Sequence, residues 1–188
     1  MFGFKKTYHS ETDLIHDCLK GKSVAQEALY QQFSSTMFAT CLRYVADETQ
    51  AEEIMVGGFL KVFNNLDKYK NEGSFEGWIR RIMINESLTV LRKRKVWLEP
   101  IENAKYQIAD CSGSDFETED LLKLIENLPI GYRTVFNLYA IEGYSHKEIA
   151  EMLGVSESTS KSQLSRARAI LQKAIETTDI STYERTGY

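Results

Sequence analysis

Apolar residues recur at helical spacing in the first half of the chain. In residues 23–45 an apolar residue occurs at every fourth position, at Leu29, Phe33, Met37 and Cys41. A second stretch of helical spacing contains Ile54, Met55, Phe59, Val62, Phe63 and Leu66. A third contains Trp78, Ile79, Ile82, Met83 and Leu88 or Leu91. The third stretch runs from about Phe75 to Lys95. This spacing predicts amphipathic α-helices whose apolar faces form a core rather than a cofactor site.

The second half continues the helical pattern. One helix is predicted over residues 120–128, because Pro129 follows it, and another over residues 130–141. Residues 144–171 then predict two helices with a tight turn between them. The chain is therefore expected to have an all-α fold made of two small helical domains.

Capping residues mark several of the predicted helix starts. In a capping box, the side chains of the first residue and of the residue three positions later each satisfy a backbone amide at the helix start. The pairs with this spacing are Ser23 with Gln26, Asp47 with Gln50, and Ser145 with Glu148. Gly154 stands where a helix must end with a residue that tolerates positive φ, and Ser156 can cap the helix that follows.

The helix after this turn carries polar chemistry. We expect Leu164, Ala167 and Leu171 to face inward, and the outer face to be covered by Ser158, Thr159, Lys161, Ser162, Gln163, Ser165, Arg166 and Arg168. Arg, Lys and Gln can reach base edges in the major groove, while Ser, Thr and a helix amino terminus bind phosphate oxygens. The pattern is that of a DNA-binding helix-turn-helix, and the alternative is an ordinary helical hairpin with a solvated face. The joint occurrence of cap, glycine turn and basic polar helix favours DNA binding.

A second candidate site surrounds the loop of residues 64–74. Three aromatic residues lie beside two cations and an amide, in the set Tyr69, Phe75, Trp78, Arg80, Arg81 and Asn85. Such a group could receive an unstacked base, because stacking tolerates any base while an amide can discriminate one base edge. The alternative is that Phe75 and Trp78 belong to the core, and composition alone favours it.

Charge is segregated along the chain. The 188 residues carry a net charge of −4, so any DNA contact must depend on local patches. Residues 78–95 are rich in Arg and Lys, whereas residues 99–120 are acidic and include Ser112-Gly113-Ser114. We interpret residues 96–119 as a flexible acidic linker between domains at residues 23–95 and 120–176. An N-terminal leader at residues 1–22, loose over residues 1–12, precedes them, and a fraying tail at residues 177–188 follows.

Cysteine and histidine residues indicate neither disulfides nor a metal site. Cys18, Cys41 and Cys111 are far apart and odd in number, and the three histidines form no cluster, so we expect reduced thiols, no metal and no cofactor. The sequence has no long apolar segment and no signal-peptide pattern, which predicts a cytoplasmic protein without a membrane span. It also lacks a nucleophile with a base and a phosphate-binding glycine loop, so an enzyme is not expected.

Both halves together resemble the extracytoplasmic-function (ECF) sigma factors, the minimal members of the bacterial sigma-70 family. The segments QAEEI, FLKVFNNLDKY and FEGWIRRIMIN resemble region two, and LPIGYRTVFNLYAIEGYSHKEIAEMLGVSESTSKSQLSRAR resembles region four. The resemblance implies a subunit that binds the beta-prime clamp helices and the beta flap of core RNA polymerase, reads the minus thirty-five element and melts the minus ten element of promoter DNA. It also implies an anti-sigma factor as a partner.

The resemblance assigns roles to particular residues. It implies upstream-element contacts by Ser158, Thr159, Lys161, Ser162, Gln163, Ser165 and Arg166, a flipped-base pocket at Asn85 bordered by Tyr69, Phe75, Trp78, Arg80 and Arg81, and polymerase contacts by Glu52, Glu53, Ile54 and Lys61. The sequence departs from the family pattern at Val56-Gly57-Gly58, at Gln163 and at Ser160, where a Val usually packs the recognition helix. We expect the last change to weaken that packing.

One rival function remains from the sequence. A self-sufficient helix-turn-helix regulator, whose first helices sense a ligand or dimerise, needs no polymerase surface but leaves the residues from Tyr69 to Asn85 unexplained. The expected function is therefore promoter-specific transcription initiation as a sigma factor.

Overall fold

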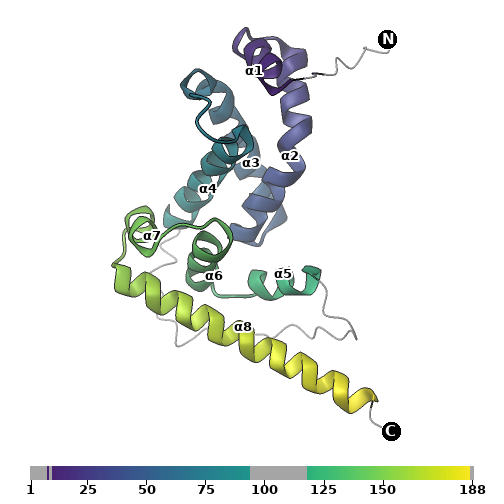
Figure 1. The fold of residues 1–188 in the computed structure, drawn as a ribbon, viewed down its shortest axis with the longest axis vertical. Coiled ribbons are helices and arrows are strands. Elements are labelled where there is room, and N and C mark those ends of the chain that lie inside the picture. The colour runs from purple at the N-terminus through teal and green to yellow at the C-terminus, as the bar shows by residue number, and fades with distance from the viewer. Residues whose placement is uncertain (1–7, 9, 94–117, 187–188) are drawn as a thin grey trace. The chain divides into compact units, whose positions relative to one another are not determined.

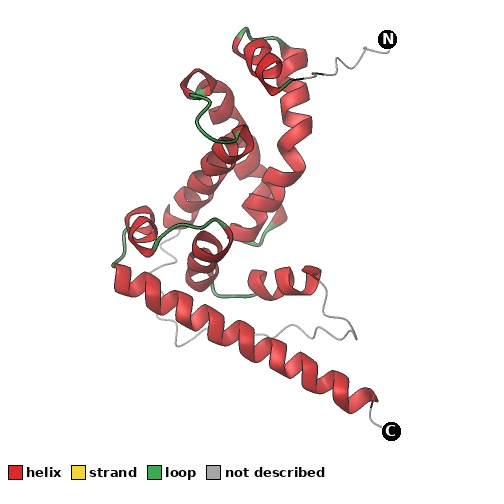
Figure 2. Cartoon of the chain, in the orientation of Figure 1, coloured by secondary structure: helices red, strands yellow, loops and turns green. Residues whose placement is uncertain are grey.

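The computed structural model describes residue 8, residues 10–93 and residues 118–186, drawn in colour in Figure 1. Over these residues the secondary structure is helical, without a strand (Figure 2), which confirms the predicted all-α class. The chain divides into two compact units, Met1–Thr89 and Val90–Tyr188. Each has its own core and is described by itself.

The first unit contains α1 (Glu11–Leu19), α2 (Ser23–Val45), α3 (Glu48–Asn64), the short η1 (Leu66–Lys68) and the start of α4 (Phe75–Lys93). Helix α2 packs along α3, and α1 packs on α2. The predicted apolar stripes are buried in this core, including Leu29, Phe33, Met37 and Cys41 of α2, Ile54, Met55, Phe59 and Val62 of α3, and Ile79, Met83 and Leu88 of α4. The periodicity therefore identified the core of this unit.

Helix α1 lies within the expected N-terminal leader and begins at the end of the part that we expected to be loose. Ser10 caps it by accepting a hydrogen bond from the Asp13 amide at 3.0 Å, and Leu14 and Cys18 are buried. This helix was not predicted from the sequence, because nine residues show little periodicity and the helix is held mainly by its packing.

Of the two capping pairs predicted in the first unit, one is present and the other is not. The Gln50 amide donates to Asp47 Oδ1 at 2.7 Å, so the cap of α3 is confirmed. The cap at Ser23 is wrong, because Lys22 occupies the capping position of α2 and makes no side-chain cap bond. Lys22 instead pairs with the buried Asp17 of α1 at 2.8 Å, which fixes the turn between the two helices.

Gly58 allows α3 and α4 to approach each other closely. A Cβ atom at this position would lie 2.2 Å from Sδ of Met83 on α4, a distance that real contacts do not reach. The neighbouring Gly57 has nothing within 4 Å of its corresponding position. Packing therefore explains one of the two interior glycines of α3 and leaves the other without a steric reason.

The second unit contains α5 (Thr118–Glu126), α6 (Ile130–Phe136), the π-helical turn η4 (Asn137–Ile141), α7 (His146–Leu153) and α8 (Glu157–Thr186). Its core is formed by Leu124, Ile125, Leu128, Tyr132, Ala167, Leu171 and Ala174. The break predicted at Pro129 separates α5 from α6. Of the expected linker, residues 96–117 lie outside the described residues, and Thr118 already begins α5.

Arg133 closes the carboxyl end of α5. Its side chain is buried, and its Nη1 donates to the carbonyl oxygen of Glu126, an acceptor that the end of α5 leaves open, and to that of Leu128 in the turn that follows. Burial lowers the pKa of this guanidinium to about 10, although the nearby Glu126 carboxylate acts in the opposite direction. The guanidinium thus remains charged at neutral pH while it holds α5 against α6.

Helix α8 extends further than the periodicity indicated. Residues 177–186, which we expected to fray, continue this helix to Thr186. The apolar stripe of α8 ends near Ala174 and Ile175, so the pattern used to predict the helix stops before the helix does.

Candidate nucleic-acid interface

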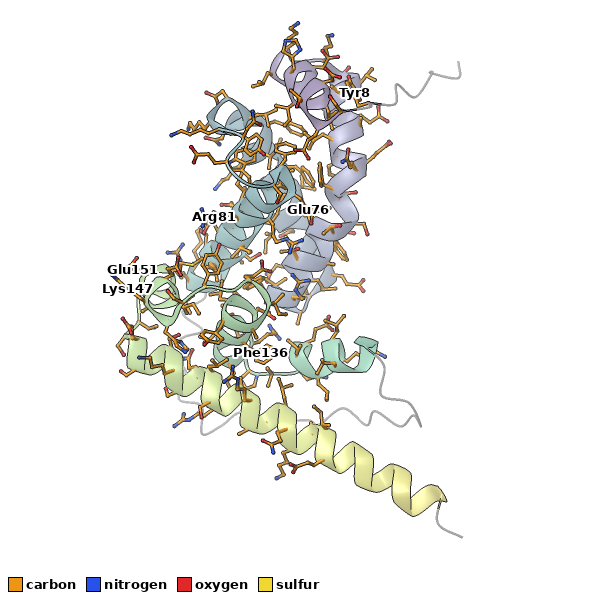
Figure 3. All side chains as sticks on the ribbon, in the orientation of Figure 1. Tyr8, Glu76, Arg81, Phe136, Lys147 and Glu151 are labelled. Atoms are coloured by element: carbon orange, nitrogen blue, oxygen red, sulfur yellow. The ribbon has the colours of Figure 1, made fainter. Side chains whose placement is uncertain are left out.

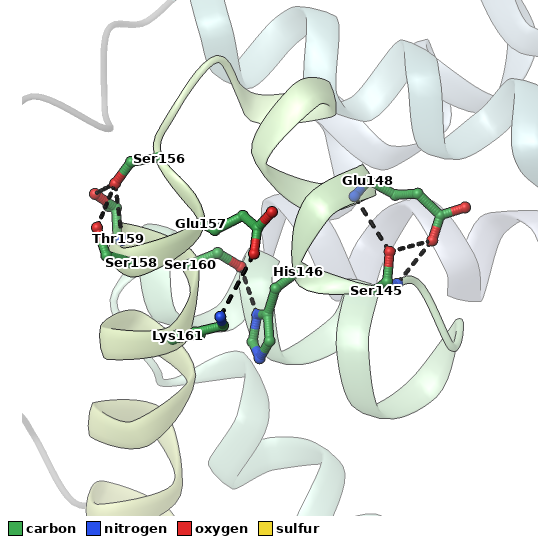
Figure 4. A network of polar contacts seen from close by, with 9 residues as sticks. All are labelled: Ser145, His146, Glu148, Ser156, Glu157, Ser158, Thr159, Ser160 and Lys161. Atoms are coloured by element: carbon green, nitrogen blue, oxygen red, sulfur yellow. Dashed lines mark hydrogen bonds and ion pairs between the residues drawn. The ribbon is translucent and has the colours of Figure 1, made fainter.

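The turn between α7 and α8 is built from local capping interactions. The Ser145 amide donates to Glu148 Oε2 at 2.8 Å and the Glu148 amide donates to Ser145 Oγ at 3.3 Å, which completes the predicted capping box (Figure 4). Gly154 ends α7 with a φ of 69°, in the left-handed region. These contacts confirm both ends of α7 as predicted from the sequence.

Hydroxyl groups gather at the amino terminus of α8. Ser156 Oγ accepts a hydrogen bond from the Thr159 amide at 3.1 Å, and it lies 2.8 Å from both Ser158 Oγ and Thr159 Oγ1 (Figure 4). The predicted cap at Ser156 is therefore present. The remaining amides of this helix start and the clustered hydroxyls can donate to an anion, as a phosphate contact would require.

The exposed side of α8 carries most of the predicted readers. Leu164, Ala167 and Leu171 are buried as predicted, whereas the exposed residues of the candidate set are Ser158, Lys161, Ser162, Ser165 and Arg166, with Thr159 half-buried. Arg166 Nη1 lies 3.4 Å from the hydroxyl of the buried Tyr132, which helps to orient its guanidinium. Cations and hydroxyls of α8 thus share one accessible surface.

Gln163 does not lie on that surface. Its side chain is only 7% exposed and packs against Gly131 of α6. If Gly131 carried a Cβ atom, that atom would lie 3.4 Å from Nε2 of Gln163. Its placement on the outer face was therefore wrong. The spacing contained the reason, because Gln163 lies three residues after the buried Ser160 and four before Ala167, within the helical stripe that faces the core.

Ser160 also differs from its expected behaviour. Its side chain is fully buried, and its Oγ lies 2.9 Å from His146 Nδ1, with the donor set by the tautomer of the ring. The expectation that Ser160 weakens the packing of α8 overlooked this partner. A hydroxyl can replace an apolar group in a core when its hydrogen bond is satisfied.

The aromatic residues of the second candidate site form one cluster. Tyr69 lies 5.0 Å from Phe75 and 5.5 Å from Trp78 between ring centroids, and Phe75 stacks on Trp78 at 5.9 Å with planes 11° apart. Tyr69 and Trp78 are half-buried, and the Tyr69 hydroxyl donates to the Gly73 carbonyl at 3.1 Å. Burial raises the pKa of this hydroxyl, and the Glu11 carboxylate acts in the same direction, so the donor is retained at neutral pH.

Phe75 is fully buried and meets Phe33 of α2 edge-on at 5.7 Å. It therefore cannot stack on a base, and its expected role as a contact residue was wrong. The core alternative holds for Phe75, whereas Tyr69 and Trp78 keep part of their rings accessible. Phe75 is the support on which those two rings are arranged.

Polar residues of α4 continue from this cluster. Trp78, Arg81 and Asn85 follow one another at spacings of three and four, so they lie along one face of the helix, and the side chains of Arg81 and Asn85 are exposed (Figure 3 labels Arg81). Arg80 is half-buried and pairs with Glu76 at 2.5 Å. Rings, an accessible cation and an amide are therefore brought together as the sequence predicted.

The residues expected to contact polymerase lie on α3. Glu52 and Glu53 are exposed, and Lys61 pairs with Glu86 of α4 at 2.5 Å. Ile54 is only 5% exposed and belongs to the core, so its expected surface position was wrong; its spacing from Met55 and Val62 already placed it on the apolar stripe.

Two exposed apolar residues of α3 were missed. Val56 is 50% exposed and Leu60 is 60% exposed, one helical turn apart. The sequence did contain a signal for these two residues, because they are apolar, lie four positions apart and fall outside the predicted buried stripe.

The described residues contain neither a metal-binding cluster nor a membrane-spanning helix. In residues 10–93 and 118–186, no group of three or more His, Cys, Asp and Glu side chains is arranged to hold a metal ion. Over the same ranges, no helix combines the length and the apolar composition that crossing a bilayer requires.

Comparison with known families matches both units of the chain in order. The sequence pattern of sigma-70 region 2 matches residues 29–96, and that of sigma-70 region 4 matches residues 118–171. The chain therefore belongs to the sigma-70 family of RNA polymerase sigma factors, the proteins of bacterial transcription initiation. Within it the chain is of the extracytoplasmic-function type, as its relatives indicate.

Individual relatives align along most of the chain. The RNA polymerase sigma-H factor of Pseudomonas aeruginosa is 24% identical over 185 residues, covering 90% of this chain and 96% of the relative. The ECF RNA polymerase sigma factor SigM of Mycobacterium tuberculosis is 24% identical over 167 residues, covering 88% and 85%. The solved structure of the sigma factor RpoE of Bartonella quintana, in complex with the anti-sigma factor NepR, has a TM-score of 0.51 at 22% identity and covers 80% of this chain and 96% of that one. That likeness concerns the fold alone.

Proposed function

We propose that this protein directs RNA polymerase to specific promoters, with its second unit reading the upstream element and its first unit trapping the unpaired downstream strand. The observation that supports the proposal most is the accessible row of cations and hydroxyls on α8, next to the capped amino terminus of that helix. The other unit of the same chain presents the rings of Tyr69 and Trp78 on the same side of α4 as the amide of Asn85. The protein makes or breaks no covalent bond in this role and needs no cofactor.

On the upstream duplex, α8 enters the major groove. Lys161, Ser162, Ser165 and Arg166 face base edges, while Ser158 and Thr159 contact phosphates beside the helix amino terminus. Each good base contact is worth about 1–3 kcal/mol of discrimination. Gln163 takes no part, because its side chain packs against α6.

On the downstream element, α4 holds an extruded base. Asn85 reads the edge of the base, Tyr69 and Trp78 offer ring surface beside it, and Arg80 and Arg81 attract the strand. Unstacking a base costs about a few kcal/mol, so a site that binds the extruded base favours opening and selects sequence in the same step.

Core polymerase binds through α3, by Glu52, Glu53 and Lys61 together with the exposed Val56 and Leu60. The partners are the beta-prime clamp helices for the first unit and the beta flap for the second. An anti-sigma factor is a further partner, as the solved complex of RpoE with NepR suggests. The protein acts in the cytoplasm, where polymerase and promoter DNA meet.

Reconstituted transcription tests this proposal. Core polymerase with the full chain should initiate from a defined set of genomic promoters in a genome-wide run-off. Arg166→Ala should lower initiation at those promoters by about 5- to 150-fold, which corresponds to a loss of about 1–3 kcal/mol. Lys173→Ala is the matched control, because Lys173 is an exposed cation further along α8 and should leave initiation unchanged.

Two results would refute the proposal. The first is initiation from no promoter while the protein alone binds operators tightly, as a self-sufficient regulator would. The second is an equal loss of initiation in Arg166→Ala and Lys173→Ala. It would show that α8 contributes only its positive charge and does not read base edges.

A further inference from the structure

A polar contact joins α7 and α8 at a point where the surrounding contacts are apolar. Ser160 is fully buried in α8 and is hydrogen-bonded to the ring of His146, the first residue of α7, at 2.9 Å. Figure 4 shows the two side chains pointing toward each other from their separate helices. The buried residues of α7 are Ile149, Ala150 and Leu153, all apolar, so Ser160 and His146 add a polar contact where α7 and α8 pack together.

The same histidine continues the contact to a third element. Its ring stacks on Tyr139 of η4, with centroids 4.5 Å apart and planes 22° apart. The guanidinium carbon of Arg168, which belongs to α8, lies 5.6 Å from the centroid of the Tyr139 ring. The contacts therefore run from α8 through α7 and η4 and return to α8.

This closed set of contacts holds α8 at two points. Ser160 and Arg168 are eight residues apart, which corresponds to about 12 Å along a helix at 1.5 Å per residue. Helix α8 also packs on α6, and its Leu164 and Ala167 are buried between these two points. The contacts at Ser160 and Arg168 add to that packing and constrain the tilt of the helix further. The proposed readers Lys161, Ser162 and Ser165 lie between the two points.

Tyr139 lies in the π-helical turn Asn137–Ile141, a rare conformation that often occurs at functional sites. The residue is 36% exposed, so it is covered only in part. Both features suggest that the turn serves to present this ring to His146 and Arg168.

We propose that Ser160, His146, Tyr139 and Arg168, the recognition-helix brace, set the orientation of α8 and thereby the selectivity of this sigma factor among upstream promoter elements. The inference rests on the proposed function, because it concerns how the proposed readers are aimed. The four residues are positioning residues, and none of them needs to touch a base. The brace takes the place of the usual apolar contact at position 160.

The test uses polymerase holoenzyme reconstituted with the full chain. Two promoters that differ by one base pair in the upstream element compete in the same transcription reaction, and the ratio of their transcripts measures discrimination. Tyr139→Ala and Ser160→Val should each lower this ratio about tenfold, since the first removes the ring and the second removes the hydrogen bond while keeping an apolar side chain in the core. Combining the two should lower it little further, because both break one set of contacts.

Two variants serve as controls. Tyr139→Phe keeps the ring and both of its contacts and should retain discrimination. Lys147→Ala changes an exposed residue next to His146 on α7 and should do the same. Thermal unfolding of each variant shows whether the protein is folded at the temperature of the assay. A variant that is folded there and still loses discrimination does not lose it through unfolding.

The outcomes separate the two hypotheses. A wild-type holoenzyme that ignores the upstream base pair would overturn the proposed function, and this inference with it. A wild-type holoenzyme that discriminates, together with undiminished ratios in Tyr139→Ala and Ser160→Val, would overturn the inference alone. So would a loss in Tyr139→Phe as large as that in Tyr139→Ala, because the ring contacts would then not be the cause.

Discussion

Gly57 and Gly58 are neighbours in α3, yet the structure predicts opposite effects when each is replaced by alanine. A Cβ at Gly57 meets nothing within 4 Å, so Gly57→Ala gains helix propensity without a clash. The expected gain in the free energy of unfolding is about 0.5–1 kcal/mol. For a unit of this size that corresponds to a rise in Tm of about 2–8 °C.

Gly58→Ala gains the same propensity but must displace a buried side chain. The new Cβ would lie 2.2 Å from Met83 Sδ and 2.9 Å from Met83 Cε, and Met83 is fully buried. Overpacking a core costs about 1–3 kcal/mol, and the low end of this range applies because the atoms in the way belong to the flexible end of Met83. We therefore expect Gly58→Ala to lower the free energy of unfolding by up to about 0.5 kcal/mol, since the cost slightly exceeds the propensity gain.

Urea unfolding measures both changes. A Trp97→Phe background leaves Trp78 as the single tryptophan, which reports on the first unit. The clash also predicts coupling: Met83→Ala should be less destabilising in the Gly58→Ala background, because the new methyl group then occupies part of the space that Met83 leaves. Equal midpoints for the two glycine variants, or a lower midpoint for Gly57→Ala, would refute this reasoning.

Three further predictions follow from the contacts. Asn85→Ala should impair promoter opening, seen by permanganate footprinting, while sparing polymerase association; equal loss of both would exclude a base-reading role. Ser145→Ala should destabilise the second unit by about 1 kcal/mol in calorimetry, because it removes the hydroxyl of the capping box, and an unchanged Tm would show that the box contributes nothing. Burial raises the pKa of the Cys18 and Cys41 thiols to about 11 from 9.0. Because the folded protein holds these thiols protonated more strongly than the unfolded chain does, they stabilise the fold fully below pH 9.0, and this stabilisation is lost as the pH rises toward 11. The urea midpoint of the wild type should therefore fall between pH 8 and pH 10, and it should fall less in Cys41→Ala, which lacks one of the two thiols.

Features set by local chemistry could be predicted from the sequence. The capping box of Ser145 with Glu148, the left-handed Gly154 and the cap at Ser156 each depend on residues within one turn of chain. The apolar stripes were equally predictable, because helical spacing decides which residues share a face. The exposed readers of α8 followed from the same spacing.

Features set by tertiary contacts could not be predicted in the same way. The Ser23 pattern failed because Lys22 is drawn to Asp17 of another helix, and α1 was missed because its stability depends on packing against α2. The bond between Ser160 and His146 joins residues fourteen positions apart, beyond any periodic pattern. Gln163 and Ile54 are different, because strict use of the helical spacing would have placed both on the buried side.

The side chain of Arg133 has a consequence for how the protein is made. Helix α5 has nine residues, fewer than the about 12–15 that an isolated helix needs to be stable in water. The carbonyl group of its last residue, Glu126, accepts a hydrogen bond from a guanidinium of the next helix. Because synthesis proceeds from the amino terminus, residues 118–126 leave the ribosome before Arg133 does. We therefore expect the nascent chain to emerge with α5 unformed, and this helix to become stable after both Arg133 and the α8 residues that cover Leu124 and Ile125 have followed it out of the exit tunnel.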